Sequence, residues 1–108
     1  MGSLKHEEIL EEFTEKVDKS LNGRVEKVIL FGSYARNEQL PGSDIDLLIV
    51  LSDVKGKDQS KISQIARGYF LEHQLVLSPK IITSDELAEK LDYSFFQEIQ
   101  KEGVEIYG

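Results

Sequence analysis

The sequence predicts an α/β (α+β) fold, because segments of extended and helical pattern follow one another along the chain. Residues 25–31 and 44–51 are short apolar runs rich in β-branched side chains, which is typical of strands. Residues 4–21 and 62–70 place apolar side chains at steps of three and four, which indicates amphipathic helices. Helices and strands therefore share one chain.

The first predicted helix, residues 4–21, carries an apolar stripe and many glutamates on its other positions. Asn22 and Gly23 are expected to end it, because both residues tolerate the left-handed conformation that closes many helices. The strand over residues 25–31 follows and leads directly into Gly32. A Gly-Ser turn is therefore expected at the end of a strand.

Residues 33–38 can form a short helix, and the Leu-Pro-Gly sequence over residues 40–42 predicts a loop. The second strand, residues 44–51, contains an apolar run interrupted only by acids near its start. Such a run implies burial on both faces, which is typical of a central strand.

A polar loop over residues 52–59 is expected before the second helix. A third strand over residues 75–82 contains Pro79, which lacks an N–H group, so an edge position or a bulge is predicted. Thr83 and Glu86 match a capping box at the start of a helix. The chain then continues into one last helix, with Phe95, Phe96 and Ile99, and a short strand over residues 104–107.

Composition limits the possible functions. The 108 residues, 40% of them hydrophobic, fit one compact domain spanning residues 1–108. A net charge of -7 repels a nucleic-acid backbone, so non-specific DNA or RNA binding is not expected, whereas a mononucleotide with its own cation is not excluded. The chain has no cysteine and no apolar run near the roughly 20 residues that cross a bilayer. We expect a cytoplasmic protein with no membrane partner.

The candidate functional side chains lie in residues 32–46, which read GSYARNEQLPGSDID. On a strand, residues two apart point to the same face, so Asp44 and Asp46 are expected side by side. A hard divalent cation, Mg²⁺ or Mn²⁺, would neutralise this patch of negative charge. A nucleoside triphosphate normally arrives with such a cation, so the spacing suggests metal-assisted phosphate chemistry.

The residues before the two acids are suited to hold phosphate. Gly32 lets the backbone approach an anion closely, and Ser33 offers its amide and hydroxyl at the start of a helix. Arg36, one turn further on, can contact phosphate through two N–H groups. We therefore expect nucleotide binding by these residues and metal binding by the acids.

Each of these residues also has a purely structural explanation. Gly32 can be a turn glycine, Ser33 and Asp44 can be caps, and Arg36 can be a solvated surface residue. Asp46 is harder to explain in this way, because burying an ionised carboxylate among Ile, Leu and Val is costly unless something compensates it. The hypothesis of a functional site therefore depends most on Asp46.

The pattern of Gly32-Ser33, ten residues, then Asp44-x-Asp46 resembles the defining motif of the nucleotidyltransferase superfamily with a DNA polymerase β-like palm. It is most similar to the minimal nucleotidyltransferase (MNT) branch. The surrounding sequences LFGSYAR and SDIDL, and the KEGV sequence near the C-terminus, are also similar to that branch. The resemblance spans most of the chain.

The resemblance implies a small mixed β-sheet flanked by helices. It also implies Mg²⁺-dependent transfer of a nucleoside monophosphate, here AMP from ATP, to an acceptor hydroxyl with release of pyrophosphate. Many minimal members are antitoxins that adenylylate a partner HEPN-domain toxin. Carried over by position, Gly32 and Ser33 would hold phosphate, and Asp44 and Asp46 would be the catalytic metal ligands.

One departure from the family pattern concerns a third carboxylate, which active members usually carry on the next core strand. Residues 75–82 contain no acid, Ser78 lies near the expected position, and Lys80 has the wrong charge for a cation ligand. Three alternatives remain. Glu72 or Asp85 supplies the carboxylate, a single-metal enzyme takes its base from the substrate or partner, or the protein binds nucleotide without turnover.

A protein of another class also fits the composition. A small acidic domain with a net charge of -7 can mask a basic toxin or ribonuclease through complementary charge and shape. In that case the chain is a catalytically weak or inactive antitoxin. Loss of nucleotide transfer after substitution of Asp44, with partner binding intact, would favour the enzyme instead.

Overall fold

The computed structural model describes residues 7–32, 44–90 and 93–107. Its helices are α1 (Glu7–Ser20), α2 (Asp58–His73), α3 (Ser84–Glu89) and α4 (Ser94–Glu102). Its strands are β1 (Val25–Phe31), β2 (Ile45–Leu51), β3 (Leu77–Thr83) and β4 (Val104–Tyr107). None of the helices in these ranges has the length and apolar character that crossing a membrane requires.

The strands form one mixed sheet in the order β3-β2-β1-β4, which confirms the sheet that the resemblance implies. β2 runs parallel to β3 and antiparallel to β1, and β4 is antiparallel to β1. Every residue of β2 except the half-buried Asp46 is buried, as its apolar run predicts for a central strand. β3 is an edge strand, which confirms the position predicted from Pro79.

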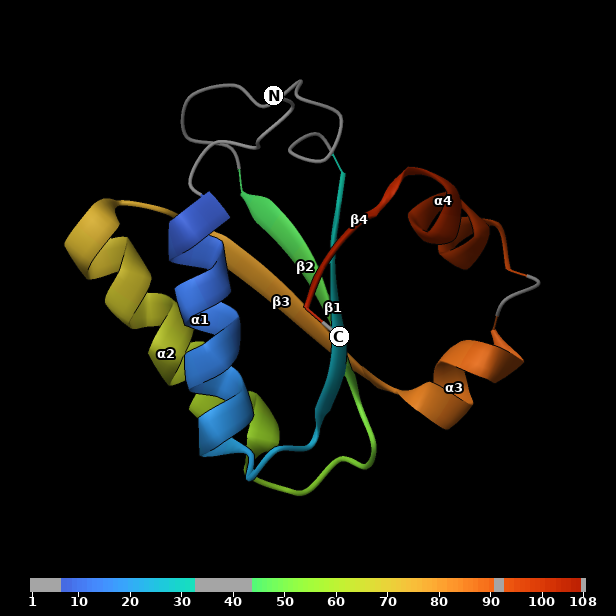
Figure 1. Ribbon diagram of the computed structural model, residues 1–108, viewed down its shortest axis with the longest axis horizontal. Coiled ribbons are helices and arrows are strands. Elements are labelled where there is room, and N and C mark those ends of the chain that lie inside the picture. Colours follow the sequence, from blue (N-terminus) through green and yellow to red (C-terminus); the bar gives the residue numbers. More distant parts are fainter. Residues whose placement is uncertain (1–6, 33–43, 91–92, 108) are drawn as a thin grey trace.

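Helices cover both faces of the sheet, with α1 and α2 on one side and α3 and α4 on the other (Figure 1). Because side chains alternate along a strand, β2 contributes to both cores. Its odd-numbered residues pack with α1 and α2, whereas Leu48 and Val50 pack with Leu87 of α3 and Ile99 of α4. Asp46 belongs to the even-numbered set and therefore lies on the α3–α4 side.

Local signals in the sequence account for most of the element ends. Asn22 and Gly23 have φ values of 57° and 78°, which confirms the predicted left-handed end of α1. The predicted capping box also forms, since the Glu86 amide donates to Thr83 Oγ1 at 3.0 Å and the Thr83 amide donates to Glu86 Oε1 at 3.3 Å. The helix and loop predicted over residues 33–42 lie outside the described residues.

The predicted bounds of β2, β3 and α2 were wrong by one or two residues. β2 begins at Ile45, so Asp44 precedes the strand, and β3 spans Leu77–Thr83 where the prediction was 75–82. α2 begins at Asp58, inside the predicted loop over residues 52–59. The Asp58 carboxylate accepts a 2.7 Å hydrogen bond from the Lys55 amide, which fixes the chain just before the helix.

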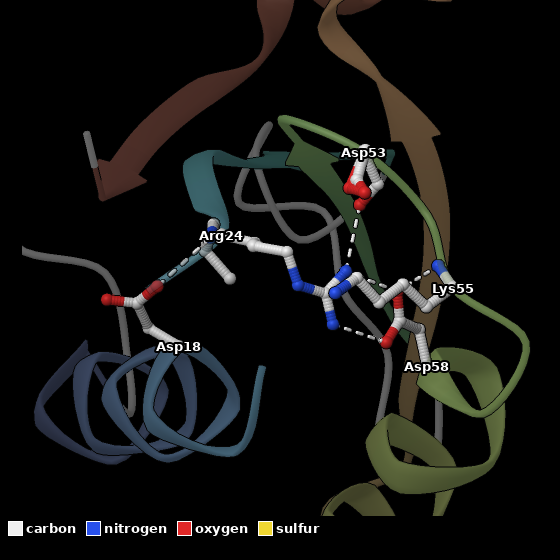
Figure 2. A network of polar contacts seen from close by, with 6 residues as sticks. Asp18, Arg24, Asp53, Lys55 and Asp58 are labelled. Carbon is white, nitrogen blue, oxygen red and sulfur yellow. Dashed lines mark hydrogen bonds and ion pairs between the residues drawn. The ribbon is translucent and has the colours of Figure 1, made fainter. Parts of the chain in front are cut away.

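An ion pair fixes the end of the sheet that lies away from Gly32 (Figure 2). The Arg24 guanidinium, just before β1, donates two 2.7 Å hydrogen bonds to Asp58, the first residue of α2. It also donates to the Asp53 carbonyl at 2.9 Å. The start of β1 is thereby tied to the segment that follows β2.

Asp18, near the end of α1, ties that helix to β1 and β4 at the same end of the sheet. Its Oδ1 atom accepts a 3.0 Å hydrogen bond from the Val25 amide, the first of β1. Its Oδ2 atom accepts a 2.6 Å hydrogen bond from the hydroxyl of Tyr107, the last residue of β4. One carboxylate therefore connects α1, β1 and β4.

The Arg24–Asp58 pair predicts a specific dependence of stability on acid. Hydrogen bonding to Arg24 lowers the pKa of Asp58 to about 2, while the group titrates near its ordinary value in the unfolded chain. The stability that the pair contributes is therefore present above about pH 4 and lost as pH falls toward about 2. The free energy of unfolding of wild type should fall by about 2 kcal/mol more than that of Asp58→Asn across this range.

Urea denaturation at a series of pH values would measure this difference. Asp53→Asn is the matched control, because Asp53 contacts Arg24 through its backbone carbonyl and its side chain is exposed. This variant should follow the wild-type dependence. Parallel curves for wild type and Asp58→Asn would contradict the assignment.

Candidate nucleotide and metal site

Three neighbouring strands meet around Asp46. The antiparallel register places Phe31, the last residue of β1, opposite Asp46 on β2, and Gly32 follows directly. On the other side of β2, the parallel register places Ser78 of β3 next to Asp46. The end of β1 and the starts of β2 and β3 therefore lie together at one end of the sheet.

Gly32 is required at this end for two structural reasons. Its φ value of +77° lies in the left-handed region, which residues with a side chain rarely adopt. A Cβ atom on this residue would also lie 2.5 Å from Oδ2 of Asp46. Sequence reasoning explained Gly32 by phosphate binding or by a turn, whereas the structure shows that its missing side chain also makes room for the Asp46 carboxylate.

The Asp46 carboxylate is in an environment that disfavours its charge. Burial raises its pKa, the negative charge of Asp44 raises it further, and the positive charge of Lys80 partly opposes both effects. Asp46 is half-buried on β2, whereas Asp44 is exposed just before the strand. Only Asp46 belongs to the strand, so the placement of the two acids side by side stays a prediction.

This pair of acids fits a hard divalent cation. Carboxylate oxygens are the ligands that Mg²⁺ prefers, and Mg²⁺ is commonly held by one or two carboxylates together with substrate phosphates and water. A cation between the acids would relieve the repulsion that raises the pKa of Asp46. Within residues 7–32, 44–90 and 93–107, no group of three acidic, histidine or cysteine side chains is arranged to hold a metal.

The third carboxylate sought from the sequence is not supplied by either candidate. Asp85 lies in α3, after Thr83, which pairs with Leu51 at the opposite end of β2 from Asp46. Leu51 is five positions along β2 from Asp46, which corresponds to about 17 Å. Glu72 lies on α2, which packs against the other face of the sheet. Strand order and helix packing therefore place neither residue beside Asp46, and of the three alternatives this one receives no support from the described residues.

Ser33 and Arg36 lie outside the described residues, so their contacts with phosphate remain predictions. Lys80 is the residue that sequence reasoning undervalued. It pairs with Leu48 across β2 and β3, and it lies two residues beyond Ser78. The alternation of side chains along a strand could have placed Lys80 on the same face as Ser78. That this face also carries Asp46 follows only from the register between β2 and β3.

Solved structures of similar fold belong to nucleotidyltransferases and toxin–antitoxin complexes. A structure from Sulfolobus solfataricus, provisionally named a nucleotidyltransferase, has a TM-score of 0.58 and 24% identity, covering 97% of this chain and 89% of that one. A toxin–antitoxin crystallised with AMP-PNP has a TM-score of 0.61 and 19% identity, covering 91% of this chain and 73% of that one. A complex of a tri-AMPylated Shewanella oneidensis HEPN toxin with an MNT antitoxin has a TM-score of 0.53 and 14% identity, covering 94% of this chain and 72% of that one. These likenesses concern the fold.

Sequence comparisons identify the family. Residues 6–105 match the model of the nucleotidyltransferase domain. A protein of Methanocaldococcus jannaschii is 35% identical over 100 residues, covering 92% of this chain and 96% of the relative. A second protein of that organism is 34% identical over 105 residues, covering 96% and 100%. Both are provisionally named protein adenylyltransferases. The chain therefore belongs to the nucleotidyltransferase domain family, as the motif around Gly32 and Asp46 predicts.

Proposed function

We propose that this protein is a metal-dependent nucleotidyltransferase that transfers AMP from ATP to a hydroxyl group on a partner protein. The close approach of Gly32 to the Asp46 carboxylate carries the proposal, because it brings a strand-end glycine and one of the two acids to one place. The two M. jannaschii relatives, provisionally named protein adenylyltransferases, support a protein as acceptor.

In the proposed reaction, the acceptor oxygen forms a bond to the α-phosphorus of ATP. The bond from that phosphorus to the oxygen bridging to the β-phosphate breaks, and pyrophosphate leaves with the electron pair. A bound Mg²⁺ or Mn²⁺ would supply positive charge that neutralises the phosphate oxygens. Asp44 and Asp46 would hold this cation, Gly32 leaves room for the Asp46 carboxylate, and Ser33 and Arg36 are expected to contact phosphate.

The proton of the acceptor hydroxyl needs a base from elsewhere. The described residues offer no third acid beside Asp44 and Asp46, so we assign this step to the substrate or the partner. Positioning and electrostatic stabilisation supply most of the catalysis in phosphoryl transfer, so two carboxylates suffice for a slow enzyme.

We propose a HEPN-domain toxin as the partner. Two of the complexes with a similar fold are toxin–antitoxin pairs, and one contains an AMPylated HEPN toxin next to its MNT antitoxin. Adenylylation would add a bulky, negatively charged group to a hydroxyl of the toxin. The toxin would then be inhibited by a covalent change that outlasts the encounter.

One observation favours a second function, that of an inactive antitoxin which masks its partner. Ser78 of β3 occupies the position beside Asp46, and β3 contains no acidic residue that could contribute to the site. With a net charge of -7, the protein can cover a basic surface without any chemistry. The two functions differ in whether the acids matter to inhibition.

Substitution of the acids distinguishes these functions. With Mg²⁺ and ATP, wild type should add adenylate to the protein encoded by the neighbouring reading frame. Intact-mass measurement of that protein would detect the added adenylate. Asp44→Asn and Asp46→Asn should each reduce transfer at least about hundredfold and still bind the partner. Asp85→Asn, at the opposite end of β2, is the control and should transfer normally. Full inhibition of the toxin by the Asp44 and Asp46 variants would support masking.

The same Asp46→Asn variant should be more stable than wild type at neutral pH without divalent cations. Burial raises the pKa of Asp46, so its ionised form costs stability in the folded protein at neutral pH. This cost disappears as pH falls through the raised pKa and the wild-type group becomes protonated. Thermal melting at neutral pH and at a pH below the raised pKa should show a higher melting temperature for the variant, by a margin that shrinks in acid. An equal margin at the two pH values would contradict the assignment.

Gly32→Ala separates backbone strain from the loss of the site. Gly23 is the matched control, because its φ value of +78° nearly equals the +77° of Gly32, yet nothing lies within 4 Å of its missing Cβ. Both substitutions should cost about 1–2 kcal/mol in unfolding free energy. Only Gly32→Ala displaces the Asp46 carboxylate, so only this variant should lose transfer, by about hundredfold. Equal losses would remove the special role of Gly32.

A further inference from the structure

Lys80 lies on the same face of the sheet as the acid of the candidate site. In the parallel register of β2 and β3, Asp46 pairs with Ser78 and Leu48 pairs with Lys80. Side chains of paired residues in neighbouring strands point to the same face, and residues two apart on one strand do so as well. Asp46, Ser78 and Lys80 therefore share the face that carries α3 and α4.

Lys80 places a positive charge near the site. Its side chain is exposed, and it pairs with Leu48, which lies two residues along β2 from Asp46 on the same face. The long, flexible stem of a lysine lets its ammonium group move while the strand stays fixed. Lys80 lies about 6–7 Å along β3 from Ser78, which places it close to whatever binds beside Asp46.

This arrangement favours one cation over two. A second divalent cation needs further oxygen ligands, and the described residues hold no group of three suitable side chains around Asp44 and Asp46. A lysine supplies positive charge without any ligands of its own, and it donates charge-assisted hydrogen bonds to phosphate. The side chain that is unsuited to bind a metal is therefore well suited to bind the substrate of that metal.

We propose that Lys80 contacts the triphosphate directly, and that the site therefore binds its nucleotide with a single divalent cation. Ser78 takes the position beside Asp46 as a neutral hydroxyl, which leaves the local negative charge low enough for one cation and one lysine to balance. This inference rests on the proposed function, since it concerns how that same site binds nucleotide.

Calorimetry with AMP-PNP and Mg²⁺ tests the contact. Lys80→Met removes the charge but keeps most of the side chain's length, and it should weaken AMP-PNP binding about tenfold or more. Lys80→Arg should recover most of the affinity, because it restores a cation. Lys19→Met removes the same charge from the exposed last turn of α1 and should bind as wild type does. The effect of Lys80→Met on AMP should be smaller, because AMP lacks the outer phosphates.

Electron paramagnetic resonance with Mn²⁺ and AMP-PNP counts the cations. Wild type should bind one Mn²⁺ for each bound nucleotide. The double variant Ser78→Asp, Lys80→Ala supplies a third acid and removes the competing charge, so it should bind a second Mn²⁺ ion. Thermal melting of each variant confirms that it is folded.

The outcomes separate this inference from the proposed function. Unchanged AMP-PNP affinity in Lys80→Met, or two Mn²⁺ ions in wild type, would overturn the inference while leaving nucleotide transfer in place. Failure of wild type to bind any nucleoside triphosphate would overturn both. Weaker binding by Lys80→Met that Lys80→Arg restores, together with one Mn²⁺ ion, would support the inference.

Discussion

The register between β1 and β2 is the constraint on which both the fold and the candidate site depend. It sets Phe31 opposite Asp46 and brings Gly32 against the carboxylate. A slip of one residue would turn Asp46 toward the core under α1 and α2, and it would exchange the apolar side chains of β2 between the two cores. The ion pair of Arg24 with Asp58 ties the start of β1 to α2 at the other end of the sheet, beyond a shift of register between Val25 and Lys27.

The site is built at a cost to the fold. Asp46 is the only residue of β2 that is not buried, and its charge is disfavoured by burial and by Asp44. Gly32 requires a left-handed backbone at the same place. Ordinary packing explains neither, since an apolar residue at position 46 would continue the run and relieve the repulsion. Two neighbouring compromises of this kind are expected where a ligand, and not stability, determines the residues.

Local patterns in the sequence predicted the parts of the structure that depend on neighbouring residues. The end of α1 at Asn22 and Gly23, the capping box at Thr83 and the edge position of β3 all follow from short-range chemistry. The bond between Arg24 and Asp58 spans 34 residues, and no local pattern marks it. The placement of Lys80 near Asp46, and the failure of Glu72 and Asp85 to reach it, likewise depend on strand order and register.

Pro79 has a consequence beyond marking β3 as an edge strand. The Ile45 amide donates to the Val76 carbonyl at 2.9 Å. In a parallel pair, the backbone N–H and C=O groups of the even-numbered residues of β3 therefore bond to β2, and those of the odd-numbered residues point away from the sheet. Pro79 is therefore among the outward residues, where its missing N–H leaves a gap in the row of free donors. An additional strand from another molecule would find an incomplete template there, which protects this border of the sheet against aggregation.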